Sequence, residues 1–148
     1  LSITRKAVQA KIDELDDEAG DEVSPLPEAW AGYVKTEGRR AVIVGGEPRP
    51  QRAEALQRVF KFSHLEWIPN SDGGQRRIQA LVTRMKKGSV DLVICLRAFS
   101  SHKAYDAVFD ATDVQCDRAL ADTYGVTQVR LAIERLVGIL PAASGAAP

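Results

Sequence analysis

The sequence predicts an α/β protein with a Rossmann-like parallel sheet of about four strands, flanked by helices and preceded by an N-terminal helical extension. Short apolar and β-branched runs alternate with longer stretches of helical periodicity, the order typical of βαβ units. The most apolar run, at 91–96, has the length of a strand buried on both faces. The run at 41–44 leads directly into two glycines and two prolines, which is typical of a strand, a tight turn and a helix start.

Length and charge indicate one domain with a helical extension. The chain has 148 residues and is 45% apolar, which is enough for a single core. We expect the extension over 1–40, the α/β domain over 41–140 and a disordered small-residue tail over 141–148. The formal charge of zero divides into −3 over 1–40 and +3 over the rest. This balance makes nucleic acid the less favoured partner.

Cysteine usage and hydropathy indicate a cytoplasmic protein. Cys95 and Cys116 have neither CxxC spacing nor paired histidines beside them, so we interpret both as reduced structural residues and expect no metal site. No apolar stretch approaches the roughly 18 residues of a membrane span, and the start of the chain lacks the apolar core of a signal peptide. We expect no membrane partner.

Residues 1–40 are expected to form two helices. The first has a narrow apolar stripe, which either lies on the main domain or pairs with a second copy or a protein partner. An acidic run over 16–22 ends it. Pro27 then begins a short helix over 28–34, in which Trp30 and Tyr33 are expected to be packing residues. The stripe of the first helix consists of Val8, Ile12 and Leu15.

The main domain is predicted to alternate strands with helices. This order implies right-handed crossovers and a parallel sheet with strand order 2-1-3-4. The run at 114–119 has a poor strand composition but falls where a fourth strand is due. The strands are expected at 41–44, 65–68, 91–96 and 114–119, and the helices near 50–60, 78–85, 104–109 and 125–140.

Three loops, at 45–49, 72–74 and 97–102, are expected to meet at the carboxyl ends of the first and third strands, where open α/β sheets bind ligands. Two adjacent glycines let the backbone approach a phosphate closely, and Arg49 can hold it with two hydrogen bonds. The pattern is neither GxGxxG nor a P-loop, which argues against NAD and ATP hydrolysis. The candidate ligand-binding residues are Gly45, Gly46, Arg49, Asp72, Gly73, Gly74, Arg97, Ser100, Ser101 and His102.

Several of these residues also have a structural interpretation. The glycines make turns, Asp72 before two glycines is an ordinary turn residue, and Ser101 is typical of a helix N-cap. His102 titrates near neutrality, so it is the candidate general acid or base if a phosphodiester binds.

The predicted helix after the second loop is basic. Arg76 and Arg77 directly follow the two glycines and are candidates for lining the same crevice. For the helix as a whole, contact with a nucleic-acid backbone and simple solvation are the alternatives. Its remaining basic residues are Arg84, Lys86 and Lys87.

Three motifs occur in a defined order in the α/β part of the chain. They are Val-Gly-Gly at 44–46 followed by Arg49, Asp-Gly-Gly at 72–74 after the second strand, and Ser-His at 101–102 after the third. With this order and spacing, residues 41 to about 137 resemble the bacterial and archaeal family called domain of unknown function 2325. The resemblance implies a Rossmann-like fold and a site at the three loops, but no activity.

The leading hypothesis is a ligand-binding or regulatory module rather than an enzyme. It senses a phosphate-bearing small molecule, with a nucleotide favoured, at the carboxyl ends of the first and third strands. Apart from this nucleotide or phosphate ligand, we expect no cofactor. Two alternatives stay open. One is a phosphodiesterase or nuclease using His102, and the other is a structural or adaptor protein that binds a partner or a second copy through 1–40.

Overall fold

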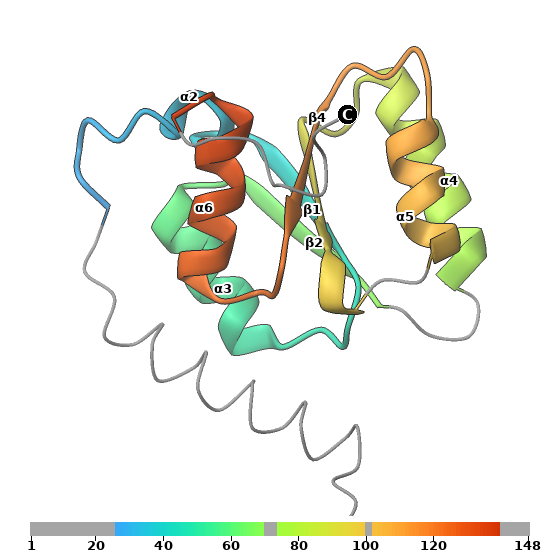
Figure 1. Cartoon of the computed structure of the whole chain (residues 1–148), viewed down its shortest axis with the longest axis horizontal. Helices are drawn as coiled ribbons and strands as arrows, with labels where there is room; N and C mark the ends of the chain where they lie inside the picture. The colour runs from blue at the N-terminus through green and yellow to red at the C-terminus, as the bar shows by residue number, and fades with distance from the viewer. Residues whose placement is uncertain (1–25, 70–73, 100–101, 140–148) are drawn as a thin grey trace, which may run out of the picture.

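The computed structural model describes residues 26–69, 74–99 and 102–139 (Figure 1). The first predicted helix, the tail over 141–148 and parts of two candidate loops lie outside these ranges. Within them, no helix combines the length and the apolar character that crossing a membrane would require.

Four parallel strands form one sheet. From one edge to the other they are β2 (His64–Ile68), β1 (Arg40–Val44), β3 (Leu92–Leu96) and β4 (Asp117–Ala121) (Figure 1). This order confirms the predicted α/β fold and strand order 2-1-3-4. Val44 at the end of β1 lies opposite Ile68 on one side and Cys95 on the other, so three strands end at the same edge of the sheet.

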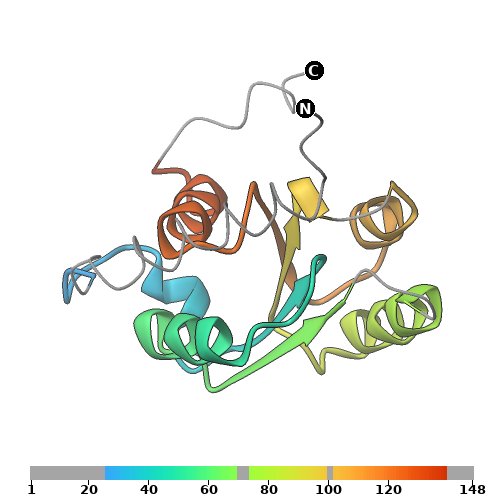
Figure 2. The ribbon, with the colours of Figure 1, turned by 90° about the horizontal axis from the view of Figure 1, so that it is seen from below.

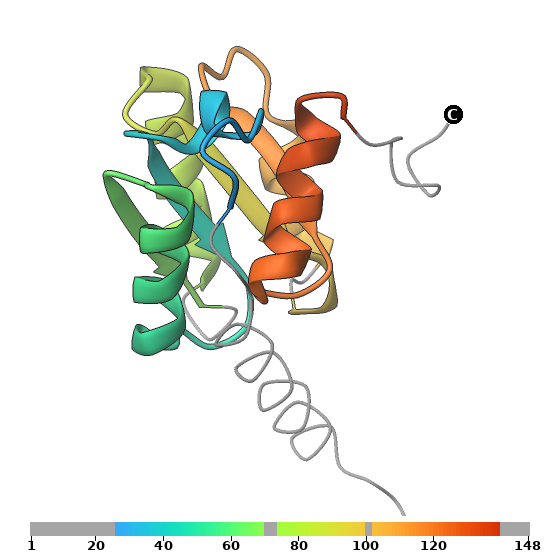
Figure 3. The same ribbon diagram turned by 90° about the vertical axis from the view of Figure 1, so that its left-hand side faces the viewer.

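Helices cover both faces of the sheet (Figure 2). The core on one face lies under α3 (Pro50–Phe60) and α6 (Val126–Leu136), with α2 (Tyr33–Thr36) beside it. The core on the other face lies under α4 (Gly74–Lys87) and α5 (His102–Asp110). Figure 3 shows α3 and α6 side by side on their face.

The central strands are apolar throughout because both of their faces are buried. On β1, Ala41 and Ile43 belong to the core under α3 and α6, whereas Val42 and Val44 belong to the core under α4 and α5. β3 is buried along its whole length, which explains the most apolar run in the sequence.

The segment before β1 is part of this core. Leu26 and Trp30 are both buried there, and the Trp30 ring lies 5.6 Å from that of Phe60. The Trp30 Nε1 donates a hydrogen bond of 2.9 Å to the Glu134 carboxylate on α6. Trp30 is therefore a packing residue, as predicted.

The predicted helix over 28–34 is wrong, because the helix is confined to α2, a single turn at Tyr33–Thr36. Before it the chain forms turns that direct Trp30 into the core, with a hydrogen bond from the Trp30 backbone to the Pro27 carbonyl. The Trp30 ring lies directly over Gly32, where a Cβ atom would come within 2.3 Å of it. Packing of one large aromatic residue thus overrides the local helical pattern.

Three other boundaries differ from the prediction. The fourth strand occupies Asp117–Ala121 rather than 114–119, because its register with β3 begins opposite Leu92. Arg97–Phe99 form a short 3-10 helix, η1, at the start of the predicted loop. α6 ends at Leu136, followed by Gly138 with a φ of 83°. A left-handed glycine at this position is a common helix terminator.

Arg118 on β4 forms hydrogen bonds with the C-terminal end of α5. Its Nη1 donates to the carbonyl oxygens of Val108, Phe109 and Ala111 at 2.9–3.1 Å. Terminal carbonyls of a helix have no partner within the helix, so a cation at this end satisfies several at once.

We predict that Arg118→Leu lowers the free energy of unfolding by about 1.5–3 kcal/mol, because it keeps side-chain bulk but removes a charged donor from these carbonyls. Urea denaturation measures the change. Arg58→Leu, at an exposed position on α3, is the control and should stay within about 0.5 kcal/mol of the wild type. Equal losses in the two variants would contradict the capping role.

Arg40 and Asp91 join the starts of β1 and β3. The Arg40 Nε and Nη2 each donate to one carboxylate oxygen of Asp91 at 3.0 Å, and the Arg40 backbone N–H donates to the same group at 2.8 Å. A further bond from Nη2 reaches the Gly88 carbonyl. The hydrogen bonds from the Arg40 side chain are the main reason that the pKa of Asp91 lies below its usual value.

A lowered pKa in the folded state predicts an acid-labile contribution to stability. The contribution is present above about pH 4 and is lost as the pH falls through the folded-state pKa of Asp91, because the unfolded chain then binds the proton more readily. We expect the free energy of unfolding of Asp91→Asn to fall less steeply below pH 4 than that of the wild type. Chemical denaturation at a series of pH values tests this, with Asp106→Asn on the exposed face of α5 as the control. Parallel acid curves for Asp91→Asn and the wild type would refute it.

Candidate functional site

The two-glycine turn follows β1 at the edge where three strands end. Gly45 and Gly46 have φ angles of 117° and 69°, a region that side chains with a Cβ atom rarely adopt. The Gly45 N–H donates to the Ile68 carbonyl at 3.0 Å, and the Trp67 Nε1 donates to the Gly45 carbonyl at 2.8 Å. β2 therefore holds both the N–H and the carbonyl of Gly45.

α3 begins directly after this turn. Arg49 is its N-cap, with an extended backbone, and Pro50 takes the first helical position, which its fixed φ suits. The cap has no side-chain hydrogen bond, and the first turn carries no acidic residue. Neither the cap nor the first turn itself therefore supplies a carboxylate to the N–H groups and the positive end of the helix dipole.

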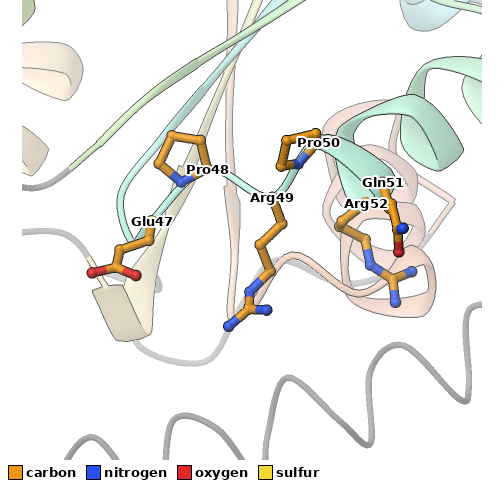
Figure 4. A pocket seen from close by; sticks show the side chains of 6 residues that line it. All are labelled: Glu47, Pro48, Arg49, Pro50, Gln51 and Arg52. Atoms are coloured by element: carbon orange, nitrogen blue, oxygen red, sulfur yellow. The ribbon is translucent and has the colours of Figure 1, made fainter.

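A pocket of about 310 Å³ opens at this helix start (Figure 4). The volume lies near the lower end of the range for small-molecule sites. Its lining contains two arginines, Arg49 and Arg52, and one carboxylate, Glu47, and both arginine side chains extend away from the turn on the same side in Figure 4. Arg52 is only 5% exposed, whereas Arg49 is half-buried. The lining residues are Glu47, Pro48, Arg49, Pro50, Gln51 and Arg52.

A fourth loop contributes to the same edge. The guanidinium carbon of Arg49 lies 5.8 Å from the ring centre of Tyr124, which comes from the loop between β4 and α6. Tyr124 is 1% exposed and packs on Trp67, with 5.4 Å between the ring centres. α6 starts immediately after it at Gly125, again with no side-chain cap. Arg49 therefore links the starts of α3 and α6.

The loop after β3 joins this edge through Asp122. The Arg97 Nε lies 3.8 Å from the Asp122 carboxylate, and the Ala98 N–H donates to the Asp122 carbonyl at 3.2 Å. Arg97 is thus at the end of β3, as predicted, and Asp122 offsets part of its charge. The sequence analysis did not identify Asp122, although its position after the fourth strand indicates this edge.

The structure places some of the predicted residues and leaves others outside its description. Gly45, Gly46 and Arg49 lie together at the pocket, and Arg97 lies at the neighbouring strand end. Gly74 and His102 are the first residues of α4 and α5. The predicted residues Asp72, Gly73, Ser100 and Ser101 fall outside the described ranges, as does the His102 side chain.

Sequence analysis missed three residues at the pocket edge. Trp67 and Tyr124 are distant in sequence from the glycines, and nothing local indicates that their rings meet. Arg52 follows Arg49 by three residues, so helical spacing after Pro50 was the available signal.

Metal and thiol chemistry have little support in the described ranges. No group of three or more His, Cys, Asp or Glu residues among them is placed to hold a metal ion. Burial raises the pKa of the Cys95 thiol to about 12. It also raises the pKa of Cys116, so both thiols stay protonated near neutral pH.

The site has to be interpreted from its own geometry. No protein-family model, curated protein or solved structure matches the chain. The resemblance to the domain of unknown function 2325 family therefore stays a prediction from the three motifs. Any conclusion about function therefore depends on the fold and the pocket.

Proposed function

We propose that the domain binds a phosphate-bearing small molecule, with a nucleotide as the favoured candidate, and acts as a sensing or regulatory module. One observation carries the proposal: Arg49 and Arg52 line a pocket at the uncapped start of α3, beside the two-glycine turn. This combination of donors, charge and close backbone approach suits a phosphate.

Electrostatics favour an anion at this position. A phosphate there would accept hydrogen bonds from the first turn of α3 and from guanidinium groups, while the helix dipole adds a partial positive charge. Among the lining residues that the structure describes, Glu47 is the one acidic side chain, and it is exposed to solvent. The six described lining residues therefore carry a net charge of +1 before the helix contributes.

The lining residues suit recognition rather than bond cleavage. They are two prolines, a glutamine, a glutamate and two arginines, which supply shape, donors and charge. The turn is also fixed before any ligand arrives, because Gly45 is hydrogen-bonded through both its N–H and its carbonyl. Preorganisation of this kind raises affinity by reducing the entropy lost on binding. We accordingly expect a bound nucleotide to be recovered unchanged after incubation with the protein.

Isothermal titration calorimetry of the full chain against a panel of mononucleotides, cyclic nucleotides and inorganic phosphate tests the proposal. We predict that Arg49→Gln weakens the tightest binding found by about tenfold or more, because it removes a charge-assisted contact. Arg58→Gln is the matched control, since it makes the same charge change on the exposed face of the same helix. Equal affinities for the two variants, or no binding by the wild type, would overturn the proposal.

A second substitution tests the turn separately from the arginine. Trp67→Phe keeps an aromatic ring near Tyr124 but removes the donor to the Gly45 carbonyl. We predict about fivefold weaker ligand binding, the equivalent of one net hydrogen bond. Trp30→Phe is the control, because it removes the donor to Glu134 near the other end of α3. If both variants bind like the wild type, the turn does not hold the ligand.

A further inference from the structure

The charged side chains of α4 are all basic. This helix lies on the face of the sheet opposite α3, the helix that starts at the pocket (Figures 1 and 2). Its 14 residues include five basic and no acidic side chains. Its apolar residues Ile78, Leu81 and Met85 are buried against the sheet, which leaves the basic ones outside. The exposed basic residues are Arg76, Arg77, Lys86 and Lys87, which we call the basic face.

The charge of the basic face has little compensation nearby. Arg84 is excluded from it because its guanidinium forms two hydrogen bonds with Glu66 on β2, at 2.8 and 3.1 Å. Among the side chains that the structure describes, none forms an ion pair with the four residues of the basic face or a hydrogen bond with their charged groups. Gln115 donates to the backbone carbonyl of Lys86, and Glu66 is close enough to Arg77 for an electrostatic interaction. Asp106 and Asp110 are exposed on the neighbouring α5 and join no ion pair with α4 within the same set.

The complementary charge is in the N-terminal part of the same sequence. Seven of the ten residues at 13–22 are acidic, and none is basic. We call this segment the acidic run. Its charge of −7 is opposite in sign to the charge of α4. α4 has no acidic residue, the acidic run has no basic residue, and the whole chain has zero net charge. This charge complementarity indicates a contact between the two segments.

The length of chain between the acidic run and Leu26 limits how much of the run can reach α4 of the same chain. Leu26 is anchored in the core under α3 and α6, whereas α4 covers the opposite face. Four residues separate position 22 from position 26, and they span at most about 14 Å when fully extended. Two helix layers on opposite faces of a sheet are about 20 Å apart, at about 10 Å for each packed interface. Glu22, at the end of the run, therefore falls short of α4 in its own chain, whereas a second copy can receive the whole run.

We propose that the acidic run of one chain docks on the basic face of a second copy, so that two chains exchange acidic runs in a symmetric homodimer. Each copy then gives one run and receives one, which closes the assembly at two. The proposal is independent of the ligand pocket, because α3 and α4 lie on opposite faces of the sheet. A nucleic-acid backbone is the competing occupant of the basic face, and the experiment separates the two.

The first measurement is the mass of the full chain by sedimentation equilibrium over a range of protein concentrations. We expect a dimer at low ionic strength that dissociates as salt rises, because the screening length falls from about 10 Å at 0.1 M to about 3 Å at 1 M. A triple neutralisation removes three exposed ion pairs at each of the two docking contacts, which should weaken dimerisation about tenfold or more. The test variant is Arg76→Gln/Lys86→Gln/Lys87→Gln, and the matched control, with the same charge change on the other side of the domain, is Arg39→Gln/Arg58→Gln/Lys61→Gln.

Charge reversal distinguishes a contact between copies from one within a chain. A variant with a reversed basic face and a variant with a reversed acidic run should each be monomeric, since the two surfaces of each then carry the same sign. Mixed together, the two should form a heterodimer, which an intrachain contact does not produce. The reversed basic face is Arg76→Glu/Lys86→Glu/Lys87→Glu, which changes its charge from +4 to −2. The reversed run is Asp13→Lys/Asp16→Lys/Asp17→Lys/Glu18→Lys/Asp21→Lys, which changes its charge from −7 to +3.

Circular dichroism of each variant confirms that the domain is folded before its mass is interpreted. Three outcomes would overturn the proposal. One is a wild-type mass that stays monomeric at all concentrations in low salt, and another is a mixture of the reversal variants that does not associate. The third is a monomeric wild type that binds a single-stranded oligonucleotide and loses this binding in the test variant but not in the control.

Discussion

The pairing of β1 with a parallel strand on each side is the constraint on which the rest of the structure depends. β1 is hydrogen-bonded to β2 and β3, so both of its faces must be apolar and both must be covered. Parallel neighbours require crossover helices, and right-handed crossovers in opposite directions place α3 on one face and α4 on the other. The same reversal leaves the carboxyl end of β1 uncovered, which is where the Gly45 turn and the start of α3 lie.

The rigidity of the pocket edge comes from residues that are far apart in the sequence. Trp67 holds the Gly45 carbonyl, packs on Tyr124 and so joins β2 to the loop before α6. Arg49 approaches the Tyr124 ring from the start of α3. The start of the first crossover helix, β2 and the loop before α6 therefore meet around one buried tyrosine. An anion bound by Arg49 would encounter a turn and two helix starts whose positions are already fixed, which is the condition for selective recognition without large rearrangement.

The fold could be predicted from the sequence because its determinants are local and periodic. The apolar run of β3 and the glycines after β1 each indicate one element without reference to the rest of the chain. The errors occurred where distant contacts decide. Trp30 turns a helical pattern into a buried turn because Phe60 and Glu134 receive it, and β4 takes its register from β3 rather than from its own composition. The roles of Trp67 and Tyr124 in the site depend on such distant contacts. The ligand-binding roles of Asp72 and Ser101 stay predictions.

Under the two proposals, β2 connects the ligand site with the dimer surface. Glu66 and Trp67 are consecutive, so their side chains point to opposite faces of the sheet. Glu66 holds Arg84 of α4 with two hydrogen bonds, while Trp67 holds the carbonyl of Gly45 at the pocket. A ligand affects dimerisation only if its affinity differs between the free and the dimerised chain, and the dimer must then affect the ligand equally. β2 contacts α4 through Glu66 and the Gly45 turn through Trp67. These two adjacent residues would therefore be the direct physical connection for such a coupling.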